Sequence, residues 1–98
     1  MTFQTETTTA VTAKEARAEY MAARAEVALL RETLDGLIVR IGDVLLAAIA
    51  GRIDDTYAST VIADHIAWYD QVSRALEDAN TAYWYTAVVY NAVTTTAT

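Results

Sequence analysis

Apolar residues recur at alternating spacings of three and four along two stretches of similar length. In the first stretch these positions hold Ala13, Ala16, Tyr20, Ala23, Val27, Leu30, Leu34, Leu37, Ile41, Val44 and Ala48. In the second they hold Ala58, Ile62, His65, Tyr69, Val72, Leu76, Ala79, Tyr83, Thr86, Tyr90 and Val93. A seven-residue period with two apolar positions is how one helix buries a stripe against another. The pattern therefore predicts two long helices that pack along this stripe, which we call the seam.

Start and stop signals divide the chain. Thr12 and Glu15 have the spacing of a capping box, which begins a helix. Gly51 suits the end of the first helix, and Asp54 or Asp55 suits the N-cap of the second. We predict an all-α antiparallel helical hairpin with a Thr-rich N-terminal arm at 1–11, a helix at 12–50, a turn at 51–54, a helix at 55–93 and a polar tail at 94–98.

One point inside the first helix is ambiguous. Asp35-Gly36 could separate two helices, but no capping residue follows it and the seam continues across it in register. A mid-helix glycine costs about 1 kcal/mol, which a long packed helix can absorb. We favour a continuous helix, with a kink at Asp35-Gly36 as the alternative.

The apolar surface is wider than a two-helix seam needs. A turn at 51–54 sets the Ala-rich half of the first helix opposite the aromatic half of the second, so that Ala23 faces Tyr83. Beyond the seam, further apolar residues would remain exposed to solvent in a lone hairpin, and such patches mark interfaces. We expect an interface at Trp68, Trp84, Tyr85, Val61, Val89, Ile38, Leu45 and Ile49. The expected partner is a second copy, completing a helical bundle by oligomerisation, or another helical protein.

Charged residues flank the first seam. Arg17, Arg24 and Arg31 recur every seven residues on one side, and Glu19 and Glu26 lie on the other. Charges at such positions set partner choice in coiled coils. The alternative interpretation is a solvated face, because exposed ion pairs contribute little.

Composition narrows the classes of protein. The 98 residues contain no proline and no cysteine, which suits long helices and excludes disulfides and zinc–thiolate sites. A net charge of −6 argues against nucleic-acid binding. No secretory signal precedes Thr12, and Arg40, Asp43 and Arg52 interrupt the most apolar stretch, so we expect no membrane span. We expect a cytoplasmic or virion-associated protein.

No residue pattern predicts catalysis. His65 lies on the seam, and Ile62 occupies the position where a di-iron bundle would place glutamate. We interpret His65 as a core histidine, or as one that tunes association with pH. Ser59 and Ser73 lack the context of a nucleophile. We therefore expect no enzyme, no catalytic or metal-binding residue and no cofactor.

The leading hypothesis is a non-enzymatic assembly or protein-interaction module, such as a small phage-like structural or accessory subunit. The alternative is an acidic inhibitor that occupies the basic groove of a nucleic-acid enzyme, although its basic residues are interspersed among the acidic ones.

A third hypothesis is a secreted helical hairpin. In length and two-helix layout the chain resembles the WXG100 family of type VII secretion substrates, a likeness of architecture alone. The Trp-x-Gly turn of that family is absent, since the turn here reads Gly51-Arg52-Ile53 and both tryptophans fall in the second helix.

Overall fold

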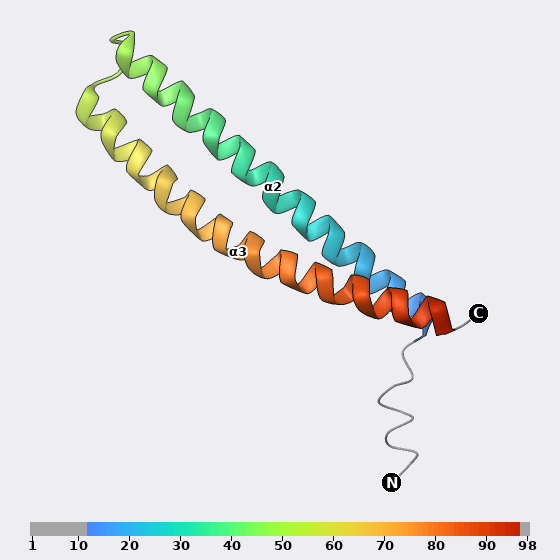
Figure 1. Cartoon of the computed structure of the whole chain (residues 1–98). Coiled ribbons are helices and arrows are strands. Elements are labelled where there is room, and N and C mark those ends of the chain that lie inside the picture. The colour runs from blue at the N-terminus through green and yellow to red at the C-terminus, as the bar shows by residue number, and fades with distance from the viewer. Residues whose placement is uncertain (1–11, 97–98) are drawn as a thin grey trace. The chain divides into compact units, whose positions relative to one another are not determined.

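A computed structural model of the chain describes residues 12–96 and contains two helices, α2 (Ala13–Ile49) and α3 (Asp55–Thr96). The predicted arm at 1–11 lies outside the described residues. Within residues 12–96 there is no strand, and the two helices run antiparallel as a helical hairpin (Figure 1). The all-α hairpin predicted from the seam is therefore confirmed, whereas oligomerisation stays a prediction.

Helix α2 is continuous across Asp35 and Gly36. A Cβ atom built on Gly36 would meet nothing within 4 Å, and the residue is exposed. The glycine is thus accommodated on the outer surface without interrupting the backbone hydrogen bonds. Of the two alternatives, the continuous helix is the one observed.

Two explicit caps make the turn. Gly51 has a φ of +73°, a left-handed conformation that favours glycine. The amides of Gly51 and Arg52 donate to the carbonyls of Ala48 (3.0 Å) and Ala47 (2.9 Å), the paired bonds of a Schellman motif. Asp54 then begins α3, because its Oδ2 accepts from the amides of Thr56 (3.1 Å) and Tyr57 (3.3 Å).

The outer ends of the helices differ in how they are fixed. Thr12 Oγ1 accepts from the Glu15 amide at 3.1 Å, as the capping box predicts. At the other end α3 continues to Thr96, three residues past the predicted end at 93. Thr94 and Thr95 donate their hydroxyls to the carbonyls of Tyr90 (2.9 Å) and Asn91 (2.7 Å). Threonines at 94–96 were expected in a polar tail, but these bonds let them remain helical.

The chain forms two compact units. The turn unit comprises residues 28–78, and the terminal unit comprises, within the described part of the chain, residues 12–27 and 79–96. Each unit contains a piece of α2 beside a piece of α3 (Figure 1).

Seam residues form the core of both units. The buried hydrophobic residues of the described chain are Ala16 and Val27 in the terminal unit and Leu37, Ala58 and Val72 in the turn unit. All five are seam positions, and among the remaining seam residues only Ala13 is exposed. A two-helix seam buries one narrow stripe, which explains why the fully buried set is small.

Candidate interaction surfaces

The predicted interface residues fall into both units. Ile38, Leu45, Ile49, Val61 and Trp68 belong to the turn unit, and Trp84, Tyr85 and Val89 belong to the terminal unit. Six of the eight are exposed, from 45% for Leu45 to 76% for Ile49, whereas Val61 and Val89 are half-buried. The structure thus divides the expected interface between the two units.

An aliphatic face covers the second half of α2 in the turn unit. Its members are all exposed and surround one glycine, Gly42; they are Ile38, Val39, Leu45, Leu46 and Ile49. These residues lie three, four and seven positions from Gly42, so they occupy one side of the helix. We call this surface the aliphatic face.

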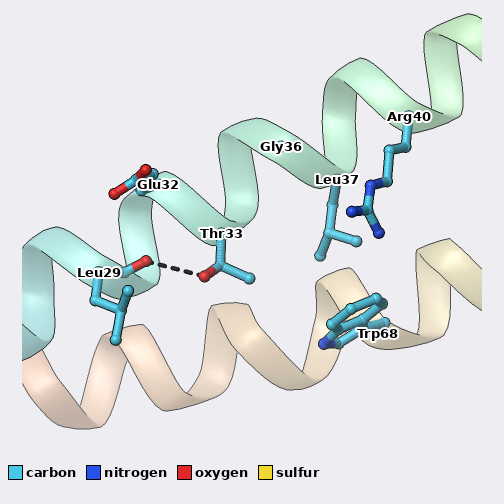
Figure 2. A pocket seen from close by; sticks show the side chains of 7 residues that line it. All are labelled: Leu29, Glu32, Thr33, Gly36, Leu37, Arg40 and Trp68. Atoms are coloured by element: carbon cyan, nitrogen blue, oxygen red, sulfur yellow. Dashed lines mark hydrogen bonds between the residues drawn. The ribbon is translucent and has the colours of Figure 1, made fainter.

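A first hollow, of about 290 Å³, opens on one flank of the turn unit. It is lined by Leu29, Glu32, Thr33, Gly36, Leu37, Arg40 and Trp68. Figure 2 shows Leu37 and Arg40 of α2 pointing toward α3, where Trp68 forms the opposite wall. Glu32 points away from α3 (Figure 2). Gly36 also lines this hollow, and a Cβ built on it would meet nothing within 4 Å.

A second hollow, of about 520 Å³, lies at the turn end of the same unit. It is lined by Leu45, Ala48, Ile49, Asp55, Ala58, Ser59 and Ile62. Small side chains from both helices create it, because Ala48, Ala58 and Ser59 leave room between the larger residues. The lining includes Leu45 and Ile49, so this hollow is continuous with the aliphatic face.

The terminal unit exposes two adjacent aromatic residues on α3 together with a few aliphatic ones. Trp84, Tyr85 and Val88 are 67%, 65% and 47% exposed on α3, and Met21 is exposed on α2. No charged residue occurs in α3 from Ala79 onward. Exposed tryptophan and tyrosine on an uncharged surface are typical of protein interfaces.

A tyrosine stack forms the interior of the terminal unit. The ring of Tyr20 stacks on Tyr83 with centroids 5.4 Å apart and on Tyr90 at 5.3 Å. The hydroxyls of Tyr20 and Tyr83 lie 3.2 Å apart. This hydrogen bond and the nearby Tyr83 hydroxyl raise the pKa of Tyr20 above 10.0, helped by partial burial and opposed by Arg24.

His65 forms a local hydrogen bond in the seam. Its Nδ1 lies 2.8 Å from the carbonyl oxygen of Val61, one turn earlier, and its ring lies 6.4 Å from that of Trp68. Within residues 12–96 no group of three or more histidine and carboxylate side chains is arranged to hold a metal ion. His65 is half-buried, and its interpretation as a core histidine stays a prediction.

Charge is distributed unequally between the units. In the turn unit nine acidic and four basic residues give a net charge of −5, whereas the described terminal unit has three of each. Arg74 pairs with Asp70 at 3.0 Å, and both side chains are largely exposed. Arg17, Arg24 and Arg31, all described and all exposed, form no ion pair within 4.0 Å. The flanking arginines are therefore available to another molecule.

Several exposed apolar residues were not among the predicted interface residues. They are Met21, Leu29, Val39, Leu46, Tyr57, Ile66 and Val88. Except for Ile66, all of them occupy the three heptad positions farthest from the seam, where the spacing of apolar residues in the sequence would have found them. Ile66 flanks the seam, where the sequence alone does not separate half-burial from exposure.

Comparisons with protein families, with curated proteins and with solved structures found no match to this chain. Among the described residues, neither helix has an apolar stretch long enough to cross a membrane.

Proposed function

We propose that this chain is a non-enzymatic assembly or protein-interaction module that packs its exposed apolar surfaces against another helical chain. The supporting observation is an imbalance. Thirteen large hydrophobic residues in the described chain are exposed, against five hydrophobic residues that are buried. Exposed apolar surface on this scale, in each of the two units, is typical of an interaction site.

The energetics favour association. Five members of the aliphatic face and Trp84 are each about half to three-quarters exposed. Covering these six side chains would contribute roughly 5–10 kcal/mol. The cost of association is of the same size, about 4–15 kcal/mol, so the predicted complexes range from weak to moderately stable. A small structural or accessory subunit, such as one in a phage-like particle, would make a contact of this strength repeatedly within one assembly.

Hydrodynamic mass tests this function. We expect sedimentation equilibrium of the full chain, from about 1 to 200 µM, to show association in that range. A variant with Leu46→Ser and Trp84→Ser should associate less, because both changes remove exposed apolar surface without touching the seam. The matched control is Asp64→Ser with Gln71→Ser, on the outer polar side of α3. A chain that stays monomeric at every concentration and binds no other helical protein contradicts the proposal.

A second candidate function rests on the charge of the turn unit. Asp64, Asp70, Glu77 and Asp78 are exposed along α3, and the unit as a whole carries −5. An acidic inhibitor of a nucleic-acid enzyme presents such a surface to a basic groove. Binding to the enzyme should weaken steeply as salt is raised, and reversing Asp64 and Asp78 to lysine should abolish it. Binding that is insensitive to salt excludes this candidate.

A further inference from the structure

We infer that two copies of this chain pair through the aliphatic face, with the α2 helices crossing antiparallel at Gly42. This inference rests on the proposed function and names the partner, a second copy. The resulting contact joins two turn units into a four-helix arrangement. Four observations carry it: the environment of Gly42, the order of the residues around it, the charges at the ends of the face, and the contrast with Gly36.

Gly42 has no role within the single chain that requires glycine. Its backbone is helical, its φ is not positive, and a Cβ built on it would meet nothing within 4 Å. A glycine in the middle of a helix costs about four- to fivefold in the helix–coil equilibrium relative to alanine. Glycine also lets another backbone approach closely. At Gly42 the space that a neighbouring helix needs is bordered by exposed aliphatic side chains.

The residues around Gly42 are arranged symmetrically along the chain. Ile38 and Val39 lie four and three positions before Gly42, and Leu45 and Leu46 lie three and four positions after it. A two-fold axis through Gly42 therefore sets Ile38 of one copy against Leu46 of the other, and Val39 against Leu45. These two pairings are aliphatic with aliphatic, whereas further from the axis Ile49 of one copy is set against the exposed carboxylate of Asp35 of the other. A self-complementary patch of this kind is what an isologous dimer needs.

Charges at the ends of the face agree with the same axis. Glu32 lies ten residues before Gly42, and Arg52 lies ten residues after it. Arg52 lies in the turn beyond the end of α2 at Ile49, so the axis brings Glu32 of each copy toward the turn of the other, and opposite charges flank the apolar centre. Both residues are exposed, and neither forms an ion pair within the described chain. Complementary charges at a rim fix orientation.

Gly36 supplies the contrast. It too is a mid-helix glycine with nothing within 4 Å of a built Cβ. Its outward neighbours at the equivalent spacings are Glu32, Thr33, Val39 and Arg40, which are largely polar. Two-fold packing through Gly36 would bury Glu32 against Arg40 with little apolar area. The two glycines therefore form a matched pair, one inside the proposed contact and one outside it.

Sedimentation equilibrium of three full-length proteins tests the inference: the unaltered chain, Gly42→Ala and Gly36→Ala. Both substitutions favour the helix, so circular dichroism melts at low concentration should shift upward for both. We expect Gly42→Ala to weaken dimerisation about tenfold, because its methyl group separates the crossing helices. Gly36→Ala should leave the dimer constant unchanged. Opposite effects on folding and on association cannot come from a general loss of structure.

Charge reversal gives a second measurement. Glu32→Arg and Arg52→Glu should each weaken the dimer about two- to fivefold, and the double variant should recover most of the loss. A dimer that responds equally to Gly42→Ala and Gly36→Ala, or whose double charge variant is as weak as the single ones, overturns this contact while leaving an interaction module in place. A chain that stays monomeric but binds a different helical protein overturns the pairing of copies and retains the proposed function.

Discussion

The turn unit and the terminal unit share one seam spacing but are stabilised by different chemistry. The turn unit is closed by two backbone caps, at Gly51 and Asp54, and its buried residues are Leu37, Ala58 and Val72. The terminal unit has no connecting turn, and Tyr20 joins its two helices by stacking on Tyr83 and Tyr90. Their surfaces differ as well, since the first exposes aliphatic residues and a net charge of −5, and the second exposes Trp84 and Tyr85 with balanced charge.

This difference indicates where stability and recognition reside. Aliphatic packing next to a tight turn is local in sequence, so the turn unit can form with a small loss of chain entropy. The terminal unit joins residues far apart in the sequence and depends on the turn unit to bring its helices together. We therefore expect the terminal unit to open first, and hydrogen exchange to be faster at residues 13–27 than at 30–48.

The largest effect should come from the core of the turn unit. Leu37 is 2% exposed, so Leu37→Ala should lower the free energy of unfolding by about 2–4 kcal/mol through lost burial and a residual cavity. Urea denaturation at low protein concentration measures it. Leu29→Ala, at a position 59% exposed, is the control and should change stability far less. Equal losses for both variants would mean that the seam is not the stabilising contact.

Helix caps offer a direct comparison of the units. Asp54→Ala should cost about 1 kcal/mol, because the amides of Thr56 and Tyr57 lose their acceptor at a helix start that is joined directly to the turn. Thr12→Ala removes a similar bond to Glu15, but here the helix can fray by a turn, so the expected cost is about 0.5 kcal/mol. Thermal melts of the two variants measure both values. A larger loss for Thr12→Ala would reverse the proposed order of stability.

The seam and the caps could be predicted from the sequence because both depend on spacing and local chemistry. Leu37 and Val72 fall on a strict three–four pattern, and Gly51 followed by Asp54 is a stop-and-start signal that needs no tertiary information. The tyrosine stack was harder to predict. The predicted register sets Tyr20 between Tyr83 and Tyr90, but it does not say that the Tyr20 ring stacks on both of them. Heptad positions give the register and say nothing of side-chain length.

The surfaces were predictable only in part. Periodicity marked Ile38, Leu45 and Ile49 as apolar beyond the seam, and all three are exposed. It also marked Val61 and Val89, which the structure shows half-buried beside the facing helix. Position on a helical wheel does not determine how far a neighbouring helix covers a flank, because that depends on the side chains of both helices.

Two glycines of the turn unit should respond with opposite signs. Gly36→Ala should raise the free energy of unfolding by about 0.5–1 kcal/mol, since alanine favours the helix and its methyl group meets no neighbour. Gly51→Ala should lower it by about 1–2 kcal/mol, because Gly51 has a φ of +73° and an L-residue is strained there. Chemical denaturation of both variants provides the measurement. Stabilisation by Gly51→Ala would show that the Schellman turn is not retained in solution.

The smallest expected effect is confined to the terminal unit and to alkaline pH. The pKa of Tyr20 is raised above 10.0, chiefly by its hydrogen bond with Tyr83. The folded state therefore holds this proton more tightly than the unfolded state, so the contribution to stability is full below pH 10.0 and is lost as the pH rises through the raised value. Tyr20→Phe keeps the stacked ring but removes this dependence. Hydrogen exchange is catalysed by base, so its rate rises with pH in any chain. Above pH 10.0 we expect exchange at residues 13–27 of the unaltered chain to rise faster than this intrinsic rate. In Tyr20→Phe we expect it to follow the intrinsic rate alone. If exchange accelerates equally in both proteins, the opening at alkaline pH is not caused by the Tyr20–Tyr83 hydroxyl pair.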